Sequence, residues 1–170
     1  MPAVSKGRLL IFALCAALAL AIAGCGSSDS STESSGDTSG SPSSEVSTNL
    51  KVKPEVTVPD GEPPQELEVI EVVEGDGAKA KEGDEVTVQY VGVGYDSEEE
   101  FDSSWSRGEP STFGLNEVIP GWNQGIAGMK VGGRRELIIP ASLAYGSEGR
   151  PPAIGPNETL ICVIDLLKVK

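Results

Sequence analysis

Short stretches of alternating or continuous apolar residues fill the second half of the chain, and this pattern predicts strands. A period of two between apolar positions is typical of a strand with one buried face. The turn signal Gly75-Asp76-Gly77 ends the first of these stretches. The predicted strands lie at 68–73, 86–91, 134–139 and 159–169, and a further strand opens at Phe101 after an acidic loop.

One segment, 120–129, instead carries helical spacing. Trp122, Ile126 and Met129 follow one another at intervals of four and three residues, as on one face of a helix. Glycines within the segment predict a short helix. The fold class predicted is therefore α+β, a mostly antiparallel sheet with one short helix across it. The long loop at 140–158 is a candidate functional loop.

The N-terminus has the layout of an export signal. Lys6 and Arg8 precede the apolar run 9–23, whose 15 residues are fewer than the roughly 20 that span a bilayer. The tetrad at 22–25 (Ile-Ala-Gly-Cys) resembles the bacterial lipobox. That resemblance implies that Cys25 is lipidated and that the protein is exported and anchored to the outer face of the bacterial cell membrane.

The composition changes sharply after this leader. Residues 26–47 are almost entirely Ser, Thr, Gly, Asp and Glu, and 52–64 are rich in proline. We therefore expect a signal peptide at 1–24, a lipidated cysteine with a disordered, partly extended tether at 25–65, and one folded domain at 66–170. A flexible tether of that length reaches roughly 30–40 Å.

Composition also excludes several classes of function. The chain has 170 residues and a formal net charge of −13, and no stretch concentrates Lys or Arg, so nucleic-acid binding is not expected. The sequence contains no histidine, which excludes serine–histidine and cysteine–histidine nucleophiles and histidine metal sites. The acidic run 98–100 is typical of a solvated loop, so neither a metal nor a cofactor is predicted. Cys162 lies in an apolar run and is expected to be a small buried hydrophobe without a disulfide.

A set of aromatic residues remains as candidate chemistry. By residue type alone they are core residues. The carboxylates nearest to them are Asp102 and Glu117, so a two-carboxylate glycosidase is conceivable, although no observation favours it. The aromatic residues are Tyr90, Phe101, Phe113, Trp122 and Tyr145.

The order of motifs around these aromatics resembles the FKBP-type peptidyl-prolyl cis–trans isomerases. The resemblance extends from about Glu68 to the C-terminus. It implies a twisted antiparallel β-sheet wrapped around one short α-helix, isomerase activity on proline-containing polypeptides and no cofactor. The motifs that carry it are Gly75–Gly77, Val88–Gly92, Phe101–Ser104, Glu117–Trp122, Gly125–Gly132, Arg134–Pro140, Leu143–Gly146 and Leu160–Leu167.

The resemblance also implies roles for particular residues. Trp122 would be the floor beneath the prolyl ring. The Ile119 amide and the Tyr145 hydroxyl would donate hydrogen bonds to substrate carbonyls, while Asp102 would orient Tyr90 or Arg107 rather than transfer a proton. The implied pocket comprises Tyr90, Phe101, Asp102, Val118, Ile119, Trp122, Tyr145 and Ile154, in which Tyr90, Phe101 and Ile154 would be walls.

Two positions depart from the family pattern. Ser111 and Cys162 stand where family members carry aromatic wall residues, so a less aromatic pocket is predicted, with weak binding of macrolides such as tacrolimus or rapamycin. Two functions therefore stay open at this stage. The first is an isomerase that assists the folding of exported proteins at the membrane, and the second is a non-catalytic module that binds proline-containing segments. A monomer is expected for both.

Overall fold

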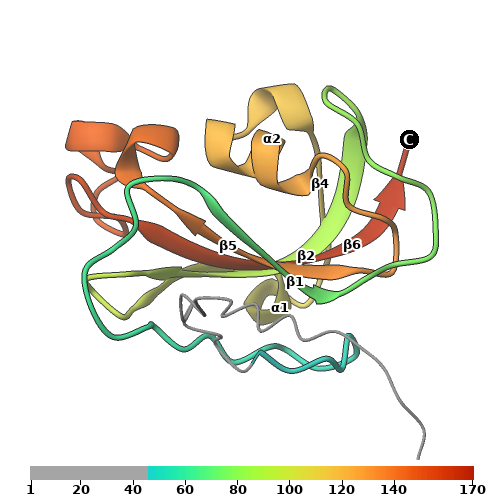
Figure 1. Cartoon of the computed structure of the whole chain (residues 1–170), viewed down its shortest axis with the longest axis horizontal. Helices are drawn as coiled ribbons and strands as arrows, with labels where there is room; N and C mark the ends of the chain where they lie inside the picture. The colour runs from blue at the N-terminus through green and yellow to red at the C-terminus, as the bar shows by residue number, and fades with distance from the viewer. Residues whose placement is uncertain (1–45) are drawn as a thin grey trace, which may run out of the picture. The chain divides into compact units, whose positions relative to one another are not determined.

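The computed structural model describes residues 46–170, in which a curved antiparallel sheet carries a short helix across one face (Figure 1). The strand order is β1-β5-β6-β2-β3, and β4 also pairs with β2. The predicted fold class is confirmed. The strands are β1 (Glu68–Val73), β2 (Glu85–Gly94), β3 (Glu100–Ser103), β4 (Ser111–Gly114), β5 (Arg134–Ile139) and β6 (Leu160–Val169).

The strand predictions agree with the structure at β1 and β5 and fall short at β2 and β4. β1 and β5 have the predicted bounds, whereas β2 runs on to Gly94 because both β3 and β6 pair with it there. β4 was not predicted. Its four residues hold one large apolar side chain, Phe113, and its pairing with Val86 of β2 is a tertiary contact that no local pattern reveals.

Helix α2 (Pro120–Ile126) ends three residues before the predicted limit. Ala127 leaves the helical conformation with a ψ of 132°, and Gly128 takes a positive φ of 86°. The remaining helices are short: α1 (Ser104–Arg107) and the 3₁₀ turns η1 (Leu115–Glu117), η2 (Ala141–Leu143) and η3 (Gly146–Glu148). The Ser103 hydroxyl caps α1 by accepting a hydrogen bond from the Ser106 amide at 3.3 Å.

Helix α2 covers the main hydrophobic core. Alternate residues of the two central strands face it, among them Val88 of β2 and Ile164 of β6. Cys162 lies on the same face and is fully buried, as predicted. Burial raises the pKa of its thiol to about 12, so the group stays protonated and inert.

The opposite face of the sheet is covered by residues 46–59, which corrects the predicted domain boundary. This segment, the N-terminal arm, crosses the sheet on the side away from α2 (Figure 1). Val56 and Val58 pack against a cluster of Tyr95, Ile138 and Ile161. The Tyr95 hydroxyl donates to the Pro59 carbonyl at 3.1 Å.

A buried ion pair also fastens the arm. Arg134 and Asp165 form a bidentate pair at 2.5 and 2.6 Å, with side chains 0% and 2% exposed. The guanidinium donates further to the carbonyls of Ser47 at 2.5 Å and Val52 at 3.3 Å. These bonds satisfy donors that the sheet alone would leave buried and unpaired, so the folded body extends at least to Val46.

The predicted leader and Cys25 lie outside the described residues. Within 46–170, no helix has the length and apolar character needed to cross a membrane.

Val56→Asp should lower the free energy of unfolding by about 1–3 kcal/mol, because it places a carboxylate against the apolar cluster beneath the arm. Thr57→Asp is the matched control, since Thr57 is exposed and the same change should cost no more than about 0.5 kcal/mol. Urea unfolding of both variants measures the difference. Equal stabilities would mean that the arm does not pack in solution.

Candidate functional site

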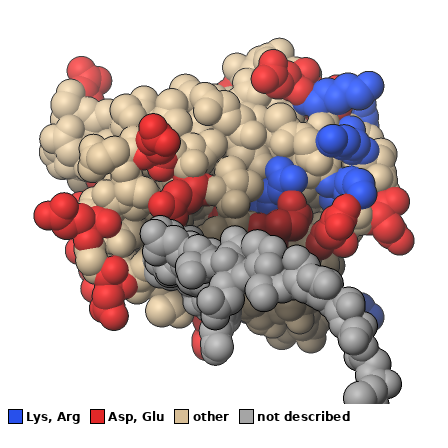
Figure 2. Space-filling view, viewed as in Figure 1, with Lys and Arg blue, Asp and Glu red and all other residues tan. Residues whose placement is uncertain are grey.

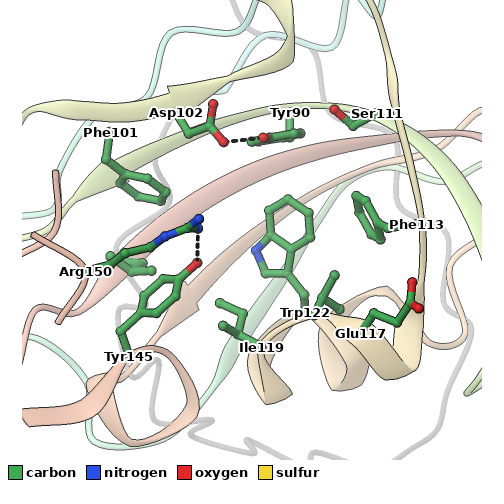
Figure 3. A pocket seen from close by; sticks show the side chains of 12 residues that line it. Tyr90, Phe101, Asp102, Ser111, Phe113, Glu117, Ile119, Trp122, Tyr145 and Arg150 are labelled. Carbon is green, nitrogen blue, oxygen red and sulfur yellow. Dashed lines mark hydrogen bonds between the residues drawn. The ribbon is translucent and has the colours of Figure 1, made fainter. Parts of the chain in front are cut away.

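A cavity of about 410 Å³ opens beside α2, between the sheet and the loops at its edge (Figure 3). Seven of the eight pocket residues expected from the resemblance line it. Figure 3 shows their side chains converging from β2, β3, α2 and the loop after β5. The seven are Tyr90, Phe101, Asp102, Val118, Ile119, Trp122 and Tyr145; the cavity is completed by Ser111, Phe113, Glu117, Arg150 and Leu160.

Trp122 forms the centre of the apolar surface. It projects from the first turn of α2 and is 8% exposed. Tyr90 meets it edge-on, with ring centroids 4.9 Å apart and planes at 79°, and Phe113 lies 5.3 Å away at 46°. Such edge and tilted contacts fix the orientation of an aromatic ring. The indole is therefore held rigidly at the cavity.

One wall depends on a missing side chain. A Cβ added at Gly92 of β2 would lie 2.4 Å from Cζ of Phe101, so glycine is needed for that ring to rest across the strand. Phe101 thereby reaches the cavity from β3.

A polar cluster borders the aromatic surface. The Tyr90 hydroxyl donates to Asp102 Oδ2 at 2.5 Å, and Arg107 pairs with the other carboxylate oxygen, Oδ1. Arg107 Nη2 also donates to the Tyr90 hydroxyl at 2.9 Å and to Ser111 Oγ at 3.0 Å. Asp102 thus contacts both groups that it was expected to orient.

Burial, followed by the hydrogen bond to Asp102, raises the pKa of Tyr90. Tyr90 therefore stays a neutral phenol at physiological pH. Because its proton is committed to Asp102, the pair serves to hold the ring rather than to carry out acid–base chemistry.

Two hydrogen-bond donors at the cavity have no acceptor among residues 46–170. The Ile119 carbonyl accepts from Trp122 N at 3.0 Å and Asn123 N at 3.2 Å, but the Ile119 N–H makes no bond. The Tyr145 hydroxyl accepts from Arg150 Nη1 at 3.3 Å and keeps its own proton available. Both donors can therefore bind carbonyl oxygens of a ligand.

One residue lies elsewhere than expected. Ile154 is 4% exposed and lines an adjoining depression of about 310 Å³ instead of the main cavity. Reciprocal hydrogen bonds between Arg150 and Ile154 fold this turn back on itself and direct the isoleucine into the core. Cys162 occupies a position where family members carry an aromatic wall residue, and here it is enclosed in the core against Trp122.

Leu160 was missed as a lining residue. It begins β6 on the same face as Cys162, and strict alternation along that strand could have identified it. Ser111 does line the cavity, as predicted from its position.

The fold and the cavity together define a small antiparallel domain whose aromatic walls suit an apolar group and whose two free donors suit carbonyls. A sequence profile of the FKBP-type peptidyl-prolyl cis-trans isomerases matches residues 76–167. The chain belongs to this family and is an isomerase of the peptide bond before proline.

Individual relatives support the same family assignment. The chain is 57% identical to an FK506-binding protein of Streptomyces anulatus over 120 residues, which cover 69% of this chain and 97% of the relative. A probable FK506-binding protein of Corynebacterium glutamicum is 50% identical over 68% of this chain and 97% of its own length.

The crystal structure of FkpA from Escherichia coli, named an FKBP-type isomerase, matches with a TM-score of 0.58 and 46% identity, over 61% of this chain and 48% of FkpA. AtFKBP13 matches with a TM-score of 0.57 and 36% identity, over 64% of this chain and 96% of its own. The family description and the name of FkpA favour an isomerase over a purely binding module.

Gly92→Ala should lower kcat/KM about ten- to a hundred-fold, because the new methyl displaces Phe101 from the cavity wall at a cost of roughly 1–3 kcal/mol. The matched control is Gly114→Ala in β4, where the nearest atom to the added Cβ is 3.4 Å away. An isomerase assay with an X-Pro peptide compares the two variants. Wild-type activity in folded Gly92→Ala would show that the position of Phe101 is unimportant.

Proposed function

We propose that this isomerase acts on proline-containing segments of exported polypeptides at the outer face of the cell membrane. The observation that carries the proposal is the cavity itself: an aromatic floor beside two unpaired donors. In the proposed complex the prolyl ring rests on Trp122. The Ile119 amide and the Tyr145 hydroxyl bind the substrate carbonyls, and Phe101 and Tyr90 enclose the ring.

The chemistry needed is torsional. Resonance keeps the peptide bond planar behind a barrier of about 18–20 kcal/mol, and the two isomers before proline are close in energy. An enzyme has only to bind the twisted amide more tightly than the planar one. The twisted form is less dipolar, so an apolar cavity favours it, and two fixed donors hold the rotated carbonyls in place.

This site can supply the free energy that the rate acceleration requires. An acceleration of a hundred- to a million-fold corresponds to about 3–8 kcal/mol of preferential binding of the twisted state. The proposed mechanism transfers no proton and uses no cofactor, which fits a sequence without histidine.

The proposed location rests on the N-terminal sequence. The basic residues, the apolar run and the lipobox-like tetrad ending at Cys25 support export followed by lipidation. Because the arm packs against the sheet from Val46, only residues 26–45 separate the proposed lipid from the folded body. These 20 residues span at most roughly 70 Å even when fully extended, so the proposed anchor would keep the catalytic domain near the bilayer.

Macrolides are proposed as weak ligands of the same cavity. Two relatives are named for binding FK506, which is tacrolimus. The small side chain of Ser111 removes apolar contact area from one wall, which lowers the expected affinity.

Tyr145→Phe should lower kcat/KM about two- to ten-fold, since it removes one of the two donors, together with the acceptor of the 3.3 Å hydrogen bond from Arg150. Tyr95→Phe is the matched control: it removes a hydroxyl that bonds to Pro59 on the opposite face of the sheet and should leave the rate unchanged. If both variants keep full activity, the Tyr145 hydroxyl does not bind the substrate.

Cys25→Ser should release the protein from the membrane fraction, because serine cannot accept the thioether-linked lipid. Cys15→Ser, within the apolar leader, should leave the protein membrane-bound. Fractionation with mass analysis of the mature N-terminus decides the matter. Continued membrane retention of unlipidated Cys25→Ser protein would contradict the anchoring proposal.

A further inference from the structure

Arg150 is the only arginine of residues 46–170 that no carboxylate neutralises. Each of the others makes an ion pair: Arg107 with Asp102, Arg134 with Asp165 and Arg135 with Glu71. Arg150 instead contacts Tyr145. Its Nη1 donates to the phenol oxygen at 3.3 Å, and its guanidinium carbon lies 5.8 Å from the ring centroid.

This charge stands at the cavity. Arg150 lines both the main cavity and the adjoining depression, so a ligand that extends from one to the other passes it. Figure 3 shows its guanidinium beside Tyr145, pointing into the cavity. The side chain is exposed, which leaves most of its five donors free to bind a ligand.

The position of the guanidinium is set by its backbone. The Arg150 amide donates to the Ile154 carbonyl at 2.9 Å, and the Ile154 amide donates back at 3.1 Å. The preceding Gly149 takes a positive φ of 63°, and a Cβ there would lie 2.3 Å from the Gly155 carbonyl oxygen. The turn is therefore closely packed, and the charge is presented from a fixed point.

The other side of the cavity carries the opposite charge. In Figure 3 Glu117 lies beyond Trp122 from Arg150, and it accepts a hydrogen bond from the Gly114 amide at 3.3 Å. No ion pair neutralises Glu117 within the described part of the chain. The remaining lining carboxylate, Asp102, is paired with Arg107. The cavity thus has a cationic side at Tyr145 and an anionic side at Glu117.

Long-range electrostatic attraction would not bring an acidic peptide to Arg150. The chain has a net charge of −13, and Figure 2 shows Asp and Glu scattered over the visible face. An acidic peptide is therefore repelled on approach, and any preference for it must arise from short-range contact with Arg150.

We propose that Arg150 is a specificity-determining residue that favours proline segments carrying an Asp or Glu side chain next to the proline. The inference rests on the proposed placement of the prolyl ring on Trp122. With the ring there, a residue flanking it toward Tyr145 brings its side chain to the guanidinium. Arginine suits this role because its planar fork can bind both oxygens of a carboxylate.

The test compares peptides that differ in a single flanking residue. Glu, the isosteric neutral Gln, and Lys are placed either before or after the proline, and kcat/KM is measured for each peptide by NMR exchange. The expected Glu-to-Gln ratio is about two- to five-fold at low salt in one of the two positions, with Lys below Gln. The ratio should fall toward one as salt is added.

Three variants test whether the preference for Glu over Gln depends on Arg150. Arg150→Gln should abolish the Glu-to-Gln ratio, and Arg150→Glu should invert the order of Glu and Lys. Lys51→Gln is the matched control, because it removes one exposed cation, without an ion-pair partner among residues 46–170, from the N-terminal arm on the opposite face and should keep the wild-type ratio.

The possible failures are distinguishable. If the neutral Gln peptides are not accelerated at all, the proposed function fails. If they are accelerated but the ratio is one at both positions, or survives in Arg150→Gln, the specificity proposal is wrong. An equal loss of rate for every peptide in Arg150→Gln would also overturn it, because Arg150 would then act only by positioning Tyr145.

Discussion

The close approach of helix α2 to the sheet is the constraint on which the rest of the structure depends. A Cβ at Gly121 would lie 2.3 Å from Cγ2 of Ile139, and one at Gly125 would lie 2.4 Å from Cδ1 of Leu137. Only glycine permits this separation. It brings Trp122 down between Tyr90 and Phe113, where the indole is fixed and one of its faces is left to the cavity. A helix one methyl group farther away would lose both the ring contacts and the shape of the site.

The two faces of the sheet have different roles. The α2 face carries the cavity, whose aromatic walls are oriented by the cluster of Tyr90, Asp102 and Arg107. The other face is closed by the N-terminal arm, which completes the hydrogen bonding of the buried Arg134–Asp165 pair. Because β5 and β6 contribute to both faces, the packing of the arm supports the strands against which α2 rests.

Much of this architecture can be read from local pattern. The longer strands and the position of the single main helix follow from the period of apolar residues, whereas the aromatic residues of the cavity follow from the resemblance to the isomerase family. The end of α2 was misplaced because Ala127 and Gly128 leave the helix while Met129 still matches its apolar spacing. The tether predicted at 25–65 included the arm, because its prolines are typical of extended linkers. Its packing depends on contacts about 80 residues away. The placement of Ile154 in the core depends on the folded turn between Arg150 and Ile154, which no local pattern reveals.

The central claim is that an apolar cavity with two fixed donors accelerates rotation about the bond before proline without transferring a proton. NMR exchange spectroscopy of a short X-Pro peptide tests it most directly, using the full chain at a small fraction of the peptide concentration. We expect a faster cis–trans exchange, an unchanged equilibrium fraction of the cis isomer, and a rate that does not fall in deuterated water. An exchange rate equal to that of the free peptide, or one slowed severalfold by deuterium, would contradict it.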